Sequence, residues 1–278
     1  MSGKLYVVGT PIGNLGDLSP RAAQVLADCG FIAAEDTRVA LKLLNHLGIK
    51  KPLVSYYEHN LRQRGEQILA RILAGEDCAI VTDAGMPCIS DPGEDLVRLC
   101  AAQGVEVVVV PGPSAVIAAL AVSGLATSRF SFEGFLSVRK TSRAEHLQQV
   151  KEDPRTLVFY EAPHKLCATL ADMLAAWGDR KISLCRELTK VHEEVRRTTL
   201  AQAVAYYQEN PPRGEFVLVI EGAAPEAEAA ATVEEAAQLA LALAQGGMSL
   251  SEAAKEAARQ TGLRRGEIYK AALSAQAQ

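Results

Sequence analysis

The sequence predicts an α/β fold: two α/β domains that enclose a cleft, followed by a small helical domain. Three observations support this prediction. Strand and helix signals alternate regularly over residues 1–122, which favours a mainly parallel sheet. The pattern becomes mixed over residues 123–222, and residues 232–278 contain short helical segments only. Residues 223–231 are rich in Ala and Glu and cannot build a core, so we expect a linker there.

The strands of the first domain are short apolar runs bounded by Gly, Pro or polar residues. The expected strands are 4–9, 31–34, 53–56, 78–82 and 105–110. The expected helices are 20–29, 37–47, 61–74, 93–103 and 115–123. Ser19 followed by Pro20 is a clear helix start, because serine caps a helix and proline suits its first position.

The second domain shows a mixture of strand and helix signals. Its expected strands are 130–135, 156–160, 182–187, 194–199 and 215–221. A helix is expected after the polar stretch 137–143, another from Pro163, and a third at 200–209. The strands at 194–199 and 215–221 are candidates to pair with each other around that third helix.

The last domain is predicted to hold three helices, at 233–245, 251–261 and 264–274, separated by Gly246-Gly247 and Gly262. Two short helices joined by a glycine turn resemble a helix-turn-helix unit. The domain carries five cations that could contact nucleic acid: Lys255, Arg259, Arg264, Arg265 and Lys270. Acidic residues in the same stretch leave open the alternative of an ordinary solvated surface.

Composition excludes several classes of protein. The net charge of the 278 residues is -4, so any nucleic-acid contact must come from local patches. No apolar run reaches the eighteen or so residues of a membrane span, and the N-terminus leads directly into a strand without a signal peptide. The six cysteines form no C-x-x-C pair and are expected to be reduced, which suits a cytoplasmic protein.

The most informative segment is the loop 83–93, Asp-Ala-Gly-Met-Pro-Cys-Ile-Ser-Asp-Pro-Gly, between a buried strand and a helix. In open α/β sheets, ligands bind beyond the carboxyl ends of the strands, where this loop lies. A purely structural interpretation makes Asp91 the cap of the next helix and Pro92 its first residue. The loops 9–17 and 111–115 also follow strands, and 160–165 follows a strand of the second domain. Together they predict an interdomain cleft that holds a mid-sized cofactor.

Several familiar sites are missing from the sequence. There is no P-loop motif, no G-x-S-x-G, and the glycines of 9–17 do not have dinucleotide-binding spacing. The five histidines form no metal-binding group, so we expect no metal.

The chain resembles the ribosomal RNA small subunit methyltransferase I family of the tetrapyrrole methylase superfamily. The resemblance covers roughly residues 4–222, and the tail fits the small C-terminal domain of that family. It is carried by the segments 9–15 (GTPIGNL), 35–38 (EDTR), 83–93, 111–115 (PGPSA) and 159–164 (FYEAPH). It implies two α/β domains of the tetrapyrrole methylase type, usually as a homodimer. The implied activity is methyl transfer from S-adenosylmethionine to the ribose 2′-oxygen of a decoding-region cytidine in 16S rRNA. The implied partner is this rRNA within the small ribosomal subunit.

The resemblance also assigns the cofactor contacts. Loop residues Gly85, Met86, Pro87, Cys88 and Ile89 would wrap its methionine end and ribose. Ser114 and Ala115 would lie near its carboxylate or sulfonium, and the second domain would close the cleft with Tyr160, Glu161 and Leu188. Met86 departs from the Gly-Asp-Pro pattern of the tetrapyrrole branch, where an Asp stands, which argues against tetrapyrrole chemistry.

Methyl transfer from a sulfonium requires mainly orientation, but a ribose hydroxyl would gain from a general base. The polar candidates near the cleft are Asp36, Glu161, His164, Glu187 and Lys190, and we single out Asp36, Glu161 and Lys190 as catalytic. Each has the alternative of a salt-bridge or capping role. Arg38 or Lys190 could instead hold an RNA phosphate. The other predicted RNA contacts are Arg139, Lys140, Arg143, Arg264 and Arg265.

Two other functions remain open. A C-methyltransferase acting on a tetrapyrrole would bind the cofactor without RNA. A non-catalytic RNA-binding or ribosome-assembly protein would bind RNA without the cofactor.

Overall fold

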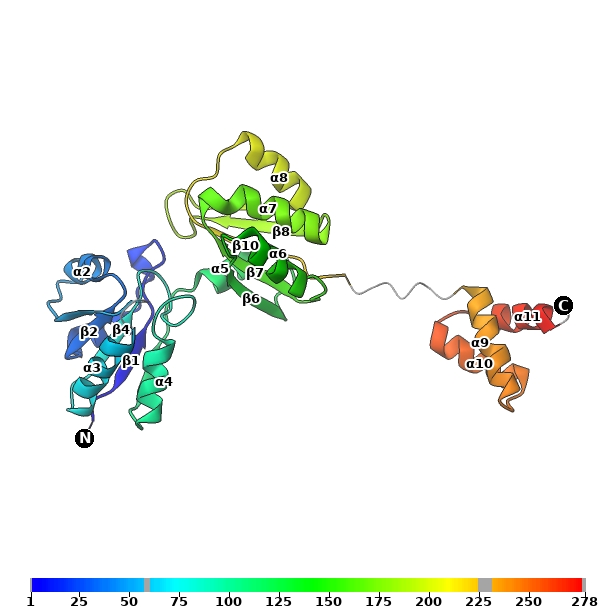
Figure 1. Ribbon diagram of the computed structural model, residues 1–278, viewed down its shortest axis with the longest axis horizontal. Coiled ribbons are helices and arrows are strands. Elements are labelled where there is room, and N and C mark those ends of the chain that lie inside the picture. Colours follow the sequence, from blue (N-terminus) through cyan, green and yellow to red (C-terminus); the bar gives the residue numbers. More distant parts are fainter. Residues whose placement is uncertain (1, 58–60, 225–231, 277–278) are drawn as a thin grey trace. The chain divides into compact units, whose positions relative to one another are not determined.

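The computed structural model describes residues 2–57, 61–224 and 232–276. The chain divides into two compact units, 1–223 and 224–278. The first unit contains two five-stranded sheets with their helices, and the second contains a group of helices (Figure 1). Most of the predicted linker, residues 225–231, lies outside the described residues. No helix in the described part of the chain is long and apolar enough to cross a membrane.

The first sheet is parallel throughout, with strand order β3-β2-β4-β1-β5. Its strands are β1 (Leu5–Val8), β2 (Phe31–Ala34), β3 (Leu53–Ser55), β4 (Cys78–Val81) and β5 (Val107–Val110). Its helices are α1 (Pro20–Asp28), α2 (Thr37–His46), α3 (Leu61–Leu73) and α4 (Glu94–Ala102), with a short 3-10 helix, η1 (Leu15–Asp17). Every predicted strand and helix of this half is confirmed within a few residues. Only η1 was not predicted.

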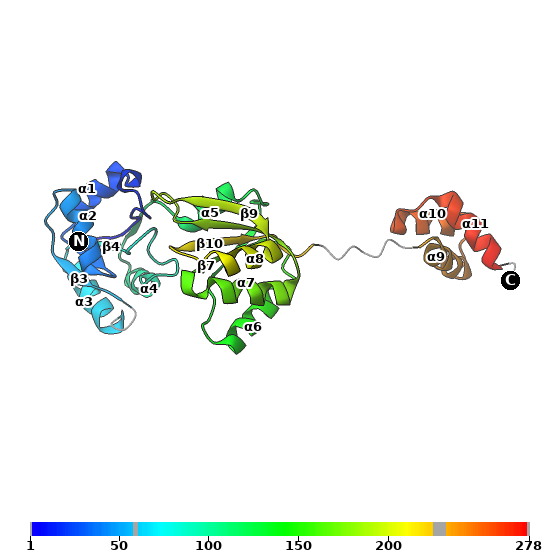
Figure 2. The ribbon, with the colours of Figure 1, turned by 90° about the horizontal axis from the view of Figure 1, so that it is seen from above.

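Helices cover both faces of the first sheet. α1 and α2 lie on one face and α3 and α4 on the other (Figure 2), and their apolar side chains pack on the sheet. The neighbouring inner strands β2 and β4 are therefore buried on both faces and contain no charged residue. As predicted, the Ser19 hydroxyl caps α1 by accepting a hydrogen bond from the backbone N–H of Ala22.

The second sheet is mixed, with strand order β6-β7-β10-β8-β9. Only β6 and β7 are parallel, and the other pairs are antiparallel. The strands are β6 (Phe130–Phe135), β7 (Thr156–Glu161), β8 (Lys181–Arg186), β9 (Glu194–Thr199) and β10 (Phe216–Ile220). The suggested pairing of β9 with β10 is wrong. β10 inserts between β7 and β8, because its five buried residues need neighbours on both sides.

Three helices, α6 (Lys140–Gln149), α7 (Pro163–Trp177) and α8 (Leu200–Glu209), supply apolar side chains to one face of the second sheet. α5 (Ala115–Ser123) covers the opposite face, where Val116, Ala119 and Leu120 pack on β7, β8 and β10. Arg197 of β9 donates to the Ser123 carbonyl at the end of α5, with an Nε–O distance of 3.2 Å. α5 therefore packs with the second sheet, although the predicted boundary at 122/123 assigned it to the first domain. The chain passes between the sheets at 111–114.

The second unit is a three-helix group of α9 (Val233–Gln245), α10 (Leu250–Thr261) and α11 (Arg265–Gln276). Thr232 and Ser249 each form a reciprocal capping box with the glutamate three residues later, which fixes the starts of α9 and α10. Gly262 ends α10 with a φ of 71°, a conformation that glycine adopts without strain. The core is built mostly from alanines, so the helices approach closely. The predicted three helices are confirmed.

Candidate functional site

The loops after β1 and β4 meet at the carboxyl edge of the first sheet. The two strands are neighbours, but the chain leaves β1 for α1 on one face and β4 for α4 on the other. Such a divergence opens a crevice, the usual ligand site of α/β sheets. Thr10 and Gly85 pair across it through two backbone hydrogen bonds of 2.9 and 3.2 Å. The 83–93 loop is therefore fixed to the 9–17 loop.

A cavity of about 450 Å³ lies between this edge and the second sheet. Its volume falls in the range of small-molecule sites, roughly 300–1,000 Å³. The first-sheet side contributes Ile12, Glu35, residues 83–86, residues 89–91, Ser114 and Ala115. The second-sheet side contributes Phe135, residues 160–163, Cys185, Glu187, Leu188, Lys190 and residues 215–217. The predicted interdomain cleft is confirmed, and loops after β1, β2, β4 and β5 all reach it.

The carboxylates on the second-sheet side are paired with lysines. Lys190 Nζ lies 2.9 Å from Glu187 Oε1 and 2.9 Å from Glu215 Oε2. Burial lowers the pKa of Lys190, but these two hydrogen bonds outweigh burial and raise it. Glu161 is buried, pairs with Lys165 at 3.0 Å, and accepts hydrogen bonds from the Thr169 hydroxyl and the Ala162 backbone. These carboxylates mainly hold the wall in shape.

The carboxylates on the first-sheet side differ, since Glu35, Asp83 and Asp91 form no ion pair among the described residues. Thr82 donates to Glu35 at 2.7 Å, and Asp83 accepts the backbone N–H of Asp36 at 3.1 Å. Burial, followed by the charge of Glu35, raises the pKa of Asp91 to about 6. The same two causes raise the pKa of Asp83. This wall therefore carries negative charge that no ion pair among the described residues neutralises, although the charge of Arg38 acts on Asp83, and the wall favours a cationic ligand.

Backbone strain is concentrated in two loops of the cleft. Among the described residues, the non-glycine residues with positive φ are Cys88, Ser90, Glu187 and Thr189, at 72°, 63°, 50° and 67°. Such conformations cost on the order of 1–3 kcal/mol each and persist where surrounding structure enforces them. Ser90 and Glu187 line the cavity. Two opposing walls thus hold strained residues, which is typical of preorganised sites.

Two glycine contacts explain how these loops pack. A Cβ at Gly13 would lie 2.4 Å from Lys190 Cγ, so the 9–17 loop lies directly on the strained 187–190 loop. A Cβ at Gly9 would lie 2.7 Å from both Gly112 and the Met86 sulfur. Only glycine permits these approaches. They bring the ends of β1 and β5 together and seat the Met86 side chain at the cavity floor.

Most of the predicted cofactor-binding residues line the cavity: Gly85, Met86, Ile89, Ser114, Ala115, Tyr160, Glu161 and Leu188. Pro87 and Cys88 do not. The Cys88 side chain packs against the core beneath α4, where Gly93 leaves room for its sulfur. Asp91 does not cap α4, because the helix begins at Glu94 with Gly93 as its N-cap. The structural interpretation of Asp91 is therefore wrong, and this side chain lines the cavity.

The three catalytic candidates occupy different positions. Lys190 and Glu161 line the cavity, but Asp36 does not. Asp36 caps α2 and pairs with Arg38, whose guanidinium lowers the pKa of the Asp36 carboxyl to about 2. A carboxyl this acidic is a poor proton acceptor. His164 also lies outside the cavity lining, whereas Glu187 is part of it.

The side chains predicted to contact RNA differ in their exposure and in their ion pairs. Arg139 and Lys140 are exposed and form no ion pair within the described residues. Arg143 is 11% exposed, pairs with Asp172 at 2.7 Å, and donates to the carbonyls of Ser137 and Val138. Arg143 therefore shapes the basic loop, and an RNA contact by it stays a prediction. Arg38, Arg264 and Arg265 are also exposed. Arg38 forms an ion pair with Asp36.

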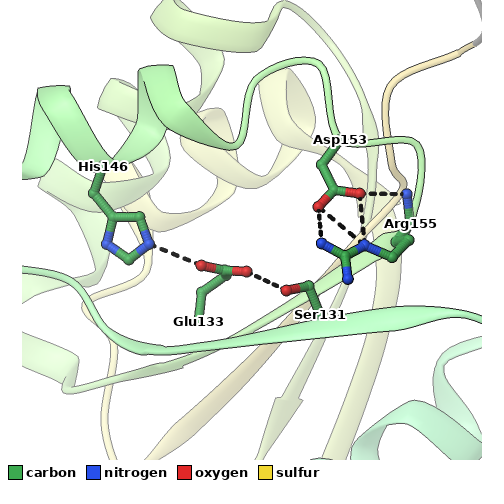
Figure 3. Close-up of polar contacts among 5 residues, drawn as sticks. All are labelled: Ser131, Glu133, His146, Asp153 and Arg155. Atoms are coloured by element: carbon green, nitrogen blue, oxygen red, sulfur yellow. Dashed lines mark hydrogen bonds and ion pairs between the residues drawn. The ribbon is translucent and has the colours of Figure 1, made fainter.

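Figure 3 shows a second polar group, on β6 and α6. Its residues are not part of the cavity lining. Glu133 accepts a hydrogen bond from Ser131, and its Oε2 lies 2.9 Å from His146 Nε2. Because the carboxylate, and not the imidazole, lies between the other two, the group does not have the arrangement of a Ser–His–acid triad. It ties α6 to β6. Asp153 and Arg155 form a separate ion pair at 2.6 Å.

Comparison with known proteins agrees with this architecture. Residues 4–204 match the family described as Tetrapyrrole (Corrin/Porphyrin) Methylases, and residues 224–276 match the RsmI C-terminal HTH domain. The chain is similar to ribosomal RNA small subunit methyltransferase I of Synechocystis sp., at 47% identity over 99% of each chain. The same enzyme of Pseudomonas aeruginosa is 47% identical over 99% of this chain and 98% of its own.

A crystal structure of diphthine synthase shows the same fold, with a TM-score of 0.63, 13% identity, and coverage of 79% of this chain and 90% of that one. The fold and the cleft define a methyltransferase of the tetrapyrrole methylase class. Within that class, the chain belongs to the ribosomal RNA small subunit methyltransferase I family.

Proposed function

We propose that this protein transfers a methyl group from S-adenosylmethionine to the ribose 2′-oxygen of a decoding-region cytidine in 16S rRNA. The observation that carries the proposal is the contrast between the acidic first-sheet side of the cavity and the apolar side chains on its second-sheet side. Three carboxylates that form no ion pair among the described residues face apolar side chains of the second-sheet side such as Leu188 and Val217. S-adenosylmethionine combines a sulfonium and an ammonium with a flat adenine. Its charges suit the acidic wall, and its ring suits the apolar lining.

S-adenosylmethionine supplies a methyl group on a positively charged sulfur, and its transfer to oxygen breaks the carbon–sulfur bond. The protein has to hold the 2′-oxygen in line with that methyl group and remove the hydroxyl proton. Asp91 suits the second task, because its pKa of about 6 leaves it ionised at neutral pH yet more basic than an ordinary carboxylate. We assign the proton to an Asp91 carboxylate oxygen.

Lys190 has a different role in this proposal. Its raised pKa keeps the ammonium protonated, so it cannot accept the hydroxyl proton. It lines the same cavity as Asp91 and can hold an RNA phosphate at the mouth or anchor the 187–190 loop. Glu161 is already bound by three donors and is assigned to support of the wall.

The proposed substrate is 16S rRNA within the small ribosomal subunit. The proposal draws support from the names of the relatives and from a C-terminal unit matching a helix-turn-helix family. It also draws on two exposed cations that form no ion pair within the described residues, Arg139 and Lys140, which follow the cavity residue Phe135 by four and five positions and suit phosphate binding. A homodimer in the cytoplasm, where ribosomes are made and work, completes the proposal.

The test combines binding and transfer. Calorimetry should detect S-adenosylmethionine binding to the purified full-length chain. Small subunits that lack the modification should then take up labelled methyl groups, and the labelled nucleotide should resist alkaline cleavage of the bond on its 3′ side. That resistance is specific for a methylated 2′-oxygen, because cleavage requires the free hydroxyl. Label at an alkali-sensitive position would exclude ribose methylation. Binding without any transfer to rRNA would refute the proposed substrate.

A further inference from the structure

Phe135, the last residue of β6, lines the cavity, yet 55% of its surface is exposed. Most phenylalanines contribute their large apolar surface to a core or an interface. The Phe135 ring instead rests against Tyr160, with centroids 5.4 Å apart. A supported but open aromatic ring at a cavity mouth is a surface on which another flat ring can stack.

A β-bulge aims this ring at the cavity. Phe132 and Phe135 are three residues apart, and in a regular strand their side chains would lie on opposite faces. The register between β6 and β7 shifts between Phe132 and Gly134, so Glu133 is an extra residue. Both phenylalanines consequently contact Tyr160, Phe132 at 5.0 Å and Phe135 at 5.4 Å. Bulges of this kind commonly redirect a side chain beside a functional site.

The side of the cavity entrance opposite Phe135 is also apolar. Ile89, in the 83–93 loop, lines the cavity and is 47% exposed. The 83–93 loop and β6 meet next to these residues, since a Cβ at Gly134 would lie 3.5 Å from Ser90 Oγ. Ile89 and Phe135 therefore flank one point of contact between the 83–93 loop and β6. The result is a pair of open apolar surfaces at the entrance to the acidic cavity.

One cation lies beside the Phe135 ring, and two more follow Phe135 closely in the chain. Lys165 Nζ is 5.5 Å from the ring centroid, and the exposed pair Arg139-Lys140 follows four residues later in the chain. Proteins that bind single-stranded nucleic acid combine the same two features, an aromatic ring for the base and cations for the backbone. An unstacked base of an RNA loop presents a flat face, and its neighbouring phosphates carry the matching charge.

We propose that Phe135 is the platform on which the base of the target nucleotide stacks, with Ile89 on the other side of that base. Stacking there would leave the attached ribose at the cavity and its flanking phosphate near Arg139 and Lys140. This inference rests on the proposed function and adds the means by which the nucleotide is held. Phe135 acts on the RNA alone in this account and has no contact with the methyl donor.

Three substitutions in the full-length protein test the proposal. Phe135→Leu keeps an apolar side chain but removes the ring, and Phe135→Trp keeps a ring. Val138→Ala is the matched control, because Val138 is 74% exposed and does not line the cavity. Each variant is assayed for kcat and KM on unmodified small subunits, and for S-adenosylmethionine affinity by calorimetry.

We expect Phe135→Leu to lower kcat/KM for the subunits on the order of 5- to 150-fold, which is the value of one base–aromatic stack. Its S-adenosylmethionine affinity should remain that of the unaltered protein. Phe135→Trp, which retains a ring, should lose much less activity than Phe135→Leu, and Val138→Ala should keep full activity. Full activity of Phe135→Leu, with the unaltered protein active, would overturn this inference and leave the proposed function standing. Loss of S-adenosylmethionine affinity in Phe135→Leu would also overturn it, by making the ring part of the donor site. An unaltered protein that methylates no subunit refutes the proposed function itself.

Discussion

Replacing Asp91 with Asn should make the protein more stable at pH 8 and less active. The folded state raises the pKa of Asp91 from 3.8 to about 6. At about 1.36 kcal/mol per unit, a shift of this size corresponds to roughly 3 kcal/mol as an upper limit. Asp91 is only partly buried, and solvent screening reduces the expected gain to about 1–1.5 kcal/mol. Asn keeps the shape of the side chain and removes the charge.

The sign of the effect follows from proton linkage. Because the pKa of this acid is raised by folding, the folded protein binds its proton more tightly than the unfolded chain does. The ionised form is therefore the costly one in the fold, and the full cost is present above about pH 6. It decreases as the pH falls below about 6 and disappears below 3.8, where Asp91 is protonated in both states.

Thermal unfolding of the two proteins at pH 8, 6 and 4.5 measures this difference. We expect the Asn variant to melt about 2–6 °C higher at pH 8, and the gap to shrink at pH 4.5. Asp17→Asn is a suitable control, because it removes the same charge from an exposed position. An Asn variant no more stable than the unaltered protein at pH 8, or a gap that does not change with pH, would refute the desolvation argument.

Activity supplies an independent result for the same variant. The kcat of the unaltered protein should rise with pH through about 6 as Asp91 ionises, and the Asn variant should lose this step. Its kcat should fall roughly 100-fold or more, in line with the usual contribution of a general base. A variant with an unchanged kcat and an unchanged pH profile would show that Asp91 is not the proton acceptor.

Three further outcomes are expected. Gly85→Ala should weaken S-adenosylmethionine binding in calorimetry, because Gly85 has a φ of 92° that costs a side chain about 1–2 kcal/mol; normal affinity would contradict this. Removal of residues 224–278 should leave that affinity unchanged, since every cavity residue belongs to the first unit, but should sharply reduce subunit methylation; full activity would rule out the proposed RNA role. Alanine at both positions of Arg139-Lys140 should reduce the slope of log affinity for RNA against log salt by roughly two units, whereas the same charge loss at Arg62 and Arg64 on α3 should not.

Local signals were sufficient to predict most of the elements. β6 and β9 begin and end at the predicted residues, because each is a short run bounded by turn-forming or helix-capping residues. The pairing of β10 could not be predicted in this way. β10 is all apolar and buried, and nothing in its own sequence indicates that its neighbours are β7 and β8. The position of α5 was missed for a similar reason, since a helix apolar on every side can pack on either sheet.

The site shows the same division between local and non-local information. The glycines and prolines of the 83–93 loop and its position after a strand predict a ligand site. Seven of its residues line the cavity: Asp83, Ala84, Gly85, Met86, Ile89, Ser90 and Asp91. Glu35 belongs to the same motif as Asp36, but only Asp36 of the two is predicted to be catalytic. Only the structure reveals that Asp36 forms an ion pair with Arg38 and that Glu35 lines the cavity. The bulge that redirects Phe135 has no signal in the sequence beyond Gly134.

Each sheet is built from one unbroken stretch of chain, 5–110 for the first and 130–220 for the second. As the ribosome releases the chain from its N-terminus, the first sheet has all of its strands before the second has been translated. The Thr10–Gly85 bridge and the three unpaired carboxylates belong to that early half, where water can still solvate them. The charges of Glu35 and Asp83 act on Asp91 within the early half, and burial by the later half adds to their cost when the cavity is completed. A cationic small molecule that binds only the completed cavity would therefore stabilise the assembled protein.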